Sequence, residues 1–299
     1  MHSYHFLIIA NFLAGKSLAK EKLEQLKNFF ERKKCSSKVV KIKKPTPISE
    51  INFKKSLKIT KGVICLGGDG TVSATIELML KKGFNLPIFV IPTGTANFIA
   101  DSLEINQKMS FKRIFEGKIK KVDLGVCQYD GKKDYFLLGI GLGFEQKFLA
   151  IAKEKSKKIL GKLSYFLAAF LELFHLEPLP YKLSFDIKNL TFQASMLTIL
   201  NFKPKVLPFL PLFPEKDIKA NDGKLDIFYV EHKNNFHSFL GIIFFHILGR
   251  MNFGLVKRFK AKELIIDSPS EQKIQIDGEL NGKLPLKVYV IPEGVRFLV

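Results

Sequence analysis

The stretch Val63-Ile64-Cys65-Leu66-Gly67-Gly68-Asp69-Gly70-Thr71 combines a short apolar strand with a glycine-rich turn. The glycines allow positive φ angles and a close approach of the backbone to a ligand, as a phosphate-binding loop requires. The Asp69 carboxylate would repel phosphates unless a divalent cation, a bound water or a polarised hydroxyl lies between them. No Gly-Lys-Ser/Thr follows, and the glycines lack the spacing of a dinucleotide-binding fold. The stretch therefore predicts phosphoryl transfer from a nucleotide through a loop of another kind.

Two other segments repeat this order of strand and polar loop. Ile88–Pro92 is a predicted buried strand before Thr93-Gly94-Thr95-Ala96-Asn97, and Phe6–Ala10 is followed by Asn11-Phe12-Leu13-Ala14-Gly15. Strands that alternate with helices form a parallel sheet, whose carboxyl-end loops share one crevice. We therefore expect one nucleotide site built by all three loops. The alternative is a set of ordinary strand-to-helix turns.

The sequence pattern changes after Val122-Asp123-Leu124-Gly125. Asp130-Gly131 lies between two apolar runs and predicts a two-residue hairpin loop. A helix is expected over Glu145–Leu176. Extended segments separated by turn residues predict an antiparallel sandwich; they are Tyr181–Ile187, Thr191–Asn201, Leu225–Glu231, Lys262–Asp267, Lys273–Asp277 and Leu286–Ile291. We predict two domains, residues 1–125 and 126–299, with the last strands either in the second domain or returning to the first.

Six motifs follow one another in an order that is similar to one family. They are Asn11…Gly15, Gly67-Gly68-Asp69-Gly70-Thr71, Pro92-Thr93-Gly94-Thr95-Ala96-Asn97, Val122-Asp123-Leu124-Gly125, Asp222-Gly223-Lys224-Leu225-Asp226 and Asp277-Gly278-Glu279. The chain resembles the diacylglycerol kinase catalytic-domain family, most closely its soluble bacterial lipid kinases. The resemblance implies an α/β fold, with an N-terminal parallel-sheet nucleotide-binding domain like that of NAD kinases and phosphofructokinases, and a C-terminal antiparallel β-sandwich domain. It also implies transfer of the ATP γ-phosphate to a lipid hydroxyl with Mg²⁺.

The resemblance also implies roles for the acidic residues. Glu279 would accept the proton of the lipid hydroxyl, with Asp277 beside it, and Asp69 would join Asp123 in a network between nucleotide and metal. Asp277 and Glu279 are two residues apart at the end of a predicted strand, so in extended geometry their side chains share a face. They would then hold a metal together, or one would bind the metal while the other acts as the base. The alternative is a polar hairpin turn.

Two sets of ligand-binding residues follow from the same resemblance. The residues that would hold ATP are Asn11, Gly15, Gly67, Gly68, Asp69, Gly70, Thr71, Gly94, Thr95 and Asn97. The magnesium site would consist of the Asp222 carboxylate and the backbone carbonyls of Lys219 and Lys224. The chain departs from the family pattern at Phe12, Ala14, Ala74, Phe98 and Asp101, and it lacks a glycine pair expected near Lys203–Val206. Because the catalytic carboxylates are retained, we predict an active kinase with shifted substrate or nucleotide contacts.

The composition is that of a globular protein, since 46% of the residues are hydrophobic and 25% are charged. A formal net charge of +20 favours anionic partners such as nucleotides and acidic lipids, although a solvated basic surface is the alternative. The basic residues are spread along the chain without a nucleic-acid-binding motif, so we expect no nucleic acid partner. Cys65 and Cys127 lie in apolar patterns and are expected in the core, without disulfides.

The lengths of the apolar segments indicate where in the cell the protein is expected. Phe6–Ala10 is too short for a signal peptide, and neither Leu163–Leu176 nor Phe236–Leu248 is long enough to span a bilayer. We therefore expect a cytoplasmic protein in peripheral contact with the anionic inner membrane surface. The proline-rich Val206–Pro214 either contacts lipid or packs on its own domain. Phe236–Leu248 is expected to be a buried helix, a homodimer face or an interfacial anchor.

Three functions remain to be compared. The first is an ATP- and Mg²⁺-dependent kinase that phosphorylates diacylglycerol or a related lipid alcohol. The second is a soluble-metabolite kinase such as NAD kinase, which shares the Gly-Gly-Asp-Gly-Thr loop; the Asp277-Gly278-Glu279 motif and the predicted sandwich argue against it. The third is a weakly active nucleotide- or lipid-binding regulator, which the departures at Ala74, Phe98 and Asp101 would favour.

Overall fold

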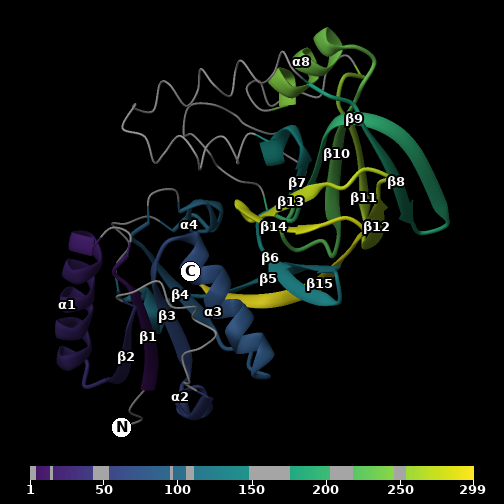
Figure 1. Ribbon diagram of the computed structural model, residues 1–299. Coiled ribbons are helices and arrows are strands. Elements are labelled where there is room, and N and C mark those ends of the chain that lie inside the picture. Colours follow the sequence, from purple (N-terminus) through teal and green to yellow (C-terminus); the bar gives the residue numbers. More distant parts are fainter. Residues whose placement is uncertain are drawn as a thin grey trace. The chain divides into compact units, whose positions relative to one another are not determined.

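The computed structural model describes residues 5–13, 16–42, 54–94, 97–105, 111–147, 176–202, 218–245 and 254–299. The chain divides into two compact units, one of Met1–Asp123 with Glu293–Val299 and one of Leu124–Pro292. Strands β5 (Ile119–Tyr129) and β15 (Leu286–Leu298) each run from one unit into the other. Figure 1 shows the described helices and strands of both units.

The first unit contains a parallel sheet. Its strands β1 (His5–Asn11), β2 (Ser36–Ile42), β3 (Gly62–Gly67) and β4 (Ile88–Pro92) lie in the order β2-β1-β3-β4, and the end of β15 pairs with β4 in parallel. β3 and β4 are buried along their whole length, as expected for strands of a parallel sheet that is covered on both faces. The loops that follow β1, β3 and β4 therefore leave the same edge of the sheet.

Helices follow the strands of this unit: α1 (Lys16–Arg32), α2 (Lys54–Ile59), α3 (Asp69–Lys81), α4 (Phe98–Ser102) and α5 (Arg113–Glu116). α1 buries apolar residues at helical spacing, among them Leu23, Leu26 and Phe30, in one cluster with Phe6 and Ile8 of β1. This cluster fixes α1 against the sheet and holds the polar loops at the sheet edge in place.

The second unit is an antiparallel β-sandwich. Its strands, besides β5 and β15, are β6 (Lys132–Phe136), β7 (Gly139–Gly143), β8 (Leu179–Phe185), β9 (Lys188–Leu200), β10 (Leu225–Glu231), β11 (Lys257–Ala261), β12 (Glu263–Asp267), β13 (Lys273–Ile276) and β14 (Glu279–Lys283). The pairings among these strands are antiparallel. A large cluster of buried side chains, including Tyr181, Leu197 and Ile227, packs between these strands.

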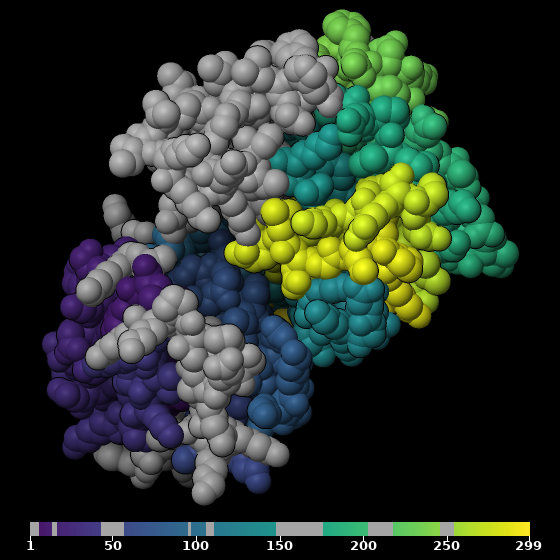
Figure 2. All heavy atoms as spheres, in the orientation of Figure 1, coloured from purple at the N-terminus to yellow at the C-terminus, as the bar shows by residue number. Residues whose placement is uncertain are grey.

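Helix α8 (Asn235–Ile243) belongs to the second unit. It buries Ser238, Gly241 and Ile242, and it leaves Phe236 70% exposed. Figure 2 shows α8 at the molecular surface, in light green. Among the helices that the structure describes, none has the length and apolar character needed to cross a membrane.

The predicted fold class is confirmed, as is the two-residue hairpin, in which Asp130 and Gly131 have φ angles of 47° and 69° between β5 and β6. Cys65 and Cys127 are buried free thiols, as expected. Strands β2 and β11 were not predicted from the sequence. Of the predicted helix from Glu145, residues 144–147 are helical and 148–175 lie outside the described residues, as does Val206–Pro214.

Candidate functional site

The loops after β1 and β3 are joined by side-chain hydrogen bonds. Ala10 pairs with Leu66 at the ends of these strands, so the residues that follow lie side by side. Asn11 Nδ2 donates to Thr71 Oγ1 at 3.0 Å, and Asn11 Oδ1 accepts from the Leu13 N–H at 2.9 Å. The structure thus brings together two of the three segments that were predicted to hold a nucleotide.

The loop after β4 lies against the same glycine turn. A methyl group placed on Gly94 would lie 2.6 Å from Gly68 Cα, so the two backbones can be this close only because residue 94 is a glycine. Asn97 has a φ of 57°, and its side-chain amide both accepts from the Gly94 N–H (3.0 Å) and donates to the Gly94 carbonyl (2.7 Å). Gly94 and Asn97 are therefore held together, and Gly94 packs on the second loop. Of the residues predicted to hold ATP, Gly15 and Thr95 lie outside the described residues.

The Asp69 carboxylate contacts the third loop directly. Asp69 is the first residue of α3, and its two oxygens accept hydrogen bonds from the Phe98 N–H (3.0 Å) and the Ile99 N–H (2.8 Å) at the start of α4. A carboxylate at the N-terminus of a helix is stabilised by the exposed N–H groups there. These backbone amides lie 29 and 30 residues after Asp69 in the sequence, and they were not predicted as its partners.

Asp123 lies at a different place in the first unit. It is buried in β5, and its Oδ1 accepts from the Glu293 N–H at 2.8 Å, at a residue whose φ is 51°. A buried carboxylate with a backbone donor thus holds Glu293, a positive-φ residue within β15, next to β5. The predicted network that links Asp123 to Asp69 remains a prediction.

The Asp277-Gly278 pair forms a tight turn between β13 and β14. Both residues have positive φ angles, 46° and 81°, which is the geometry of a two-residue hairpin with an Asp-Gly loop. The expectation that Asp277 and Glu279 share a face of an extended strand is therefore wrong, because the chain reverses between them. Glu279 is the first residue of β14 and is exposed. Figure 2 shows the yellow C-terminal segment, to which β14 belongs, at the molecular surface.

The Asp277 carboxylate is held by three backbone donors. Its oxygens accept hydrogen bonds from the N–H groups of Leu137 (2.8 Å), Leu138 (2.8 Å) and Gly139 (3.0 Å), and the Asp277 N–H donates to the Gly139 carbonyl. Hydrogen bonds to an ionised acceptor are stronger than those between neutral groups. Asp277 thus anchors the turn that carries Glu279.

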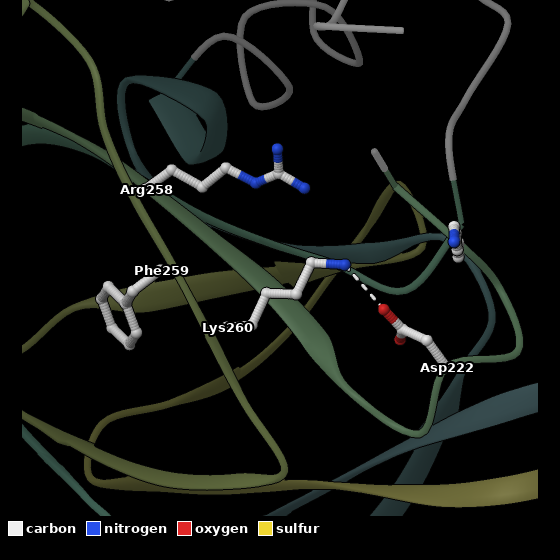
Figure 3. Close-up of a pocket in the computed structure, with 5 residues that line it drawn as sticks. Asp222, Arg258, Phe259 and Lys260 are labelled. Atoms are coloured by element: carbon white, nitrogen blue, oxygen red, sulfur yellow. Dashed lines mark hydrogen bonds and ion pairs between the residues drawn. The ribbon is translucent and has the colours of Figure 1, made fainter. Parts of the chain in front are cut away.

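The Asp222 carboxylate lies in an open pocket of about 450 Å³ that is lined by Lys219, Asp222, Arg258, Phe259 and Lys260. Figure 3 shows the Lys260 side chain reaching toward Asp222, where Nζ and Oδ2 are 2.6 Å apart. The second oxygen, Oδ1, accepts from the Lys224 N–H at 3.1 Å. Asp222 is therefore already paired with a cation of the chain itself.

Asp226 lies beside this pair. It is buried, accepts from Arg258 Nε at 2.8 Å, and has Oδ2 3.5 Å from Lys260 Nζ. Burial raises the pKa of the Asp226 carboxyl, and the Arg258 guanidinium opposes this shift. Two carboxylates thus face two cations, and a resident Mg²⁺ would add two positive charges next to both. The magnesium site predicted at Asp222 and the carbonyls of Lys219 and Lys224 remains a prediction; a metal there would compete with Lys260 Nζ for the carboxylate.

Comparison with known proteins places the chain in a family. Residues 5–127 match the model of the diacylglycerol kinase catalytic domain, and residues 140–299 match that of the YegS C-terminal NAD kinase beta sandwich-like domain. The chain belongs to the diacylglycerol kinase catalytic-domain family. A family member from Staphylococcus aureus (strain MSSA476), named "Putative lipid kinase SAS0691", is 28% identical over 257 residues, which cover 83% of this chain and 80% of the relative.

Solved structures share the fold of this diacylglycerol kinase family member. One, titled a "putative diacylglycerol kinase" from Bacillus anthracis str. Sterne, has a TM-score of 0.76 at 23% identity and covers 99% of this chain and 96% of its own. A second structure, titled as a diacylglycerol kinase from the same organism, has a TM-score of 0.71 at 20% identity, with the same coverage. The predicted family membership is confirmed.

Several residues that contact the predicted site residues of this family member were not predicted from the sequence. Lys260 lies on β11, a strand that was not predicted, and Gln275 and Glu145 were given no role. One signal was present in the sequence: charged and apolar side chains alternate in Arg258-Phe259-Lys260-Ala261, which is typical of a strand with one polar face.

Proposed function

We propose that this protein transfers the γ-phosphate of ATP to the hydroxyl of diacylglycerol or a related lipid alcohol. One observation carries the proposal: in a chain of this kinase family, the loops after β1, β3 and β4 join through the Asn11–Thr71 hydrogen bond and the Asp69 contacts with α4. Glycine-rich backbone at the carboxyl edge of a parallel sheet, followed by the start of a helix, suits a nucleotide's phosphates.

In this proposal ATP is held by the three loops. The contacts come from Asn11, Gly67–Thr71, Gly94 and Asn97, together with Gly15 and Thr95. Magnesium enters as the complex of ATP, because Mg²⁺ in kinases is commonly bound through substrate phosphates and only one or two carboxylates. This role for magnesium agrees with the Lys260 ion pair at Asp222, where the chain supplies its own cation.

Glu279 is the proposed proton acceptor. It is an exposed carboxylate next to a turn that Asp277 fixes through three backbone hydrogen bonds. As the lipid oxygen forms its bond to the γ-phosphorus, the bond from that phosphorus to the bridging oxygen breaks, the hydroxyl proton passes to Glu279, and ADP leaves. Positioning and charge stabilisation account for most of the catalysis of such reactions.

Contact with an anionic membrane completes the proposal. The formal net charge of +20 attracts the protein to a surface of acidic lipids, and Phe236 on α8 is an exposed apolar side chain. Each basic residue near such a surface contributes about 1 kcal/mol to binding. This contact would bring the protein to a substrate that resides in the bilayer.

The test is a transfer assay with labelled ATP, Mg²⁺ and a panel of lipid alcohols in mixed micelles, with NAD in a parallel reaction. Label in the organic phase is the expected result. Label on NAD would instead identify a soluble-metabolite kinase, and ATP binding without transfer would identify a regulator. Glu279→Gln is the inactive control, and Glu271→Gln, which alters another exposed glutamate of the same unit, is its matched control.

A further inference from the structure

Glu145 fills a space between side chains on one face of the sheet in the second unit. Gln275 on β13, Gly141 on β7 and Thr198 on β9 face one another across three neighbouring strands. Residues that pair across strands point to the same face, so the missing side chain of Gly141 leaves space between the other two. A methyl group on Gly141 would lie 2.1 Å from Glu145 Oε2, which shows that the carboxyl occupies this space.

Hydrogen bonds connect this carboxyl to the turn that carries Glu279. Thr198 Oγ1 donates to Glu145 Oε1 at 2.6 Å, and Gln275 Nε2 donates to Glu145 Oε2 at 3.3 Å. The other end of the same amide, Gln275 Oε1, accepts from the Gly278 N–H at 2.8 Å. Glu145 thus fixes the direction of the Gln275 amide, and that amide holds the residue directly before Glu279.

The turn therefore has two separate anchors. Asp277 is bound by the backbone of Leu137–Gly139, and Gly278 is bound by Gln275. A glycine with a φ of 81° has more freedom than other residues, so its N–H needs a fixed acceptor if the next side chain is to keep one direction. Burial also raises the pKa of the Glu145 carboxyl to about 7, while the hydrogen bonds from Thr198 and Gln275 lower it.

We propose that Glu145 is a positioning residue, which orients Glu279 through Gln275 and Gly278. The proposal rests on the proposed role of Glu279 as the proton acceptor. Glu145 itself would contact neither the nucleotide nor the lipid. Its removal should therefore lower kcat for phosphoryl transfer and leave the KM for ATP unchanged.

The test compares Glu145→Ala, Gln275→Ala and the double variant, with Glu145→Gln as the conservative variant. Each alanine variant should lower kcat by about 10- to 100-fold, because a misplaced base loses most of its effect. The double variant should be no slower than the slower single variant, since both act through one chain of contacts. Glu145→Gln should restore most of kcat, because its amide can accept from Gln275 and donate to Thr198.

Hydrogen–deuterium exchange of residues 275–282 provides a readout that does not depend on activity. Both alanine variants should exchange the Gly278 amide at least tenfold faster than the wild type, while Glu145→Gln and the control Glu271→Gln should not. A wild-type kcat or unchanged exchange in a folded Gln275→Ala variant would overturn the proposal, even if Glu145→Ala failed to fold. If the wild-type protein phosphorylated no lipid, the proposed function would fail, while the exchange data would still decide whether Glu145 holds the turn.

Discussion

Gly68 and Gly94 lie so close together that a methyl group added to Gly94 would be 2.6 Å from Gly68 Cα. The contact at 2.6 Å is with a backbone atom, which cannot move aside as the end of a flexible side chain could. The glycine turn after β3 and the loop after β4 thus form one packed unit, which explains why residue 94 has to be glycine.

Gly94→Ala should destabilise the protein, whereas Gly70→Ala should not. The first substitution forces two loops apart and should cost about 1–3 kcal/mol in the free energy of unfolding. Gly70 is exposed, and a methyl group there would meet no atom of the described residues within 4 Å. If the turn cradles phosphates, this methyl group should weaken ATP binding at least tenfold. Urea unfolding and calorimetric titration with ATP measure the two effects, and full ATP affinity in Gly70→Ala would count against the predicted nucleotide contacts.

Asp277→Asn should lower the stability of the protein, whereas Glu279→Gln should lower its activity and leave its stability unchanged. The asparagine places an NH₂ group near backbone donors and loses charged hydrogen bonds, so unfolding free energy should fall by about 1.5–3 kcal/mol. Glu279 is exposed, and its glutamine variant should keep the wild-type Tm while kcat falls by about 100-fold or more. Thermal scans and the transfer assay check both. Equal loss of Tm in the two variants would mean that Glu279, like Asp277, has a structural role.

Lys260→Met should create a response to magnesium that the wild type lacks. In the wild type the ammonium group contacts Asp222 and lies near Asp226, so adding MgCl₂ to the nucleotide-free protein should leave Tm unchanged. Without the ammonium, the carboxylates gain from a divalent cation, and Tm should rise by a few degrees with MgCl₂. Lys257→Met, on the same strand and paired with Glu231, is the control. A wild-type Tm that rises with MgCl₂ would support the magnesium site predicted at Asp222.

Glu145 should make stability depend on pH near neutrality. Its folded pKa of about 7 lies above the ordinary value of 4.5, so the folded protein holds the proton more tightly than the unfolded chain. The protonated Glu145 carboxyl therefore adds to the free energy of unfolding. This added stability is fully present below about pH 4.5 and is lost as pH rises through 7, for a total of about 3 kcal/mol at most. Unfolding free energies at pH 5 and pH 8 should therefore differ more in the wild type than in Glu145→Gln. Parallel pH curves for the two proteins would show that Glu145 titrates normally.

Much of the fold could be predicted because its signals are local. The strand β3 and its glycine turn are contiguous in sequence, and Asp130-Gly131 specifies a hairpin by its own backbone preferences. The strand β2 was missed because only Ile42 among its seven residues is buried, so it lacks an apolar run. The Asp277-Gly278 turn carried the same Asp-Gly signal, and reading Asp277 as part of an extended strand gave the wrong geometry for Glu279.

The site was harder to predict, because its contacts join residues far apart in sequence. The alternation of strands and helices predicted a parallel sheet, and this alone predicted that the loops after β1, β3 and β4 would meet. The partners of Asp69 are backbone amides of α4, and backbone amides carry no sequence signal. The Lys260–Asp222 pair depends on the position of β11 beside β10, a pairing that residue types alone do not specify.

The most direct measurement is transfer of ³²P from γ-labelled ATP into the lipid phase under single-turnover conditions. We predict labelled lipid with the wild type and Glu271→Gln, and little or none with Glu279→Gln. A folded wild-type protein that binds ATP and labels no lipid alcohol of the panel would contradict the account.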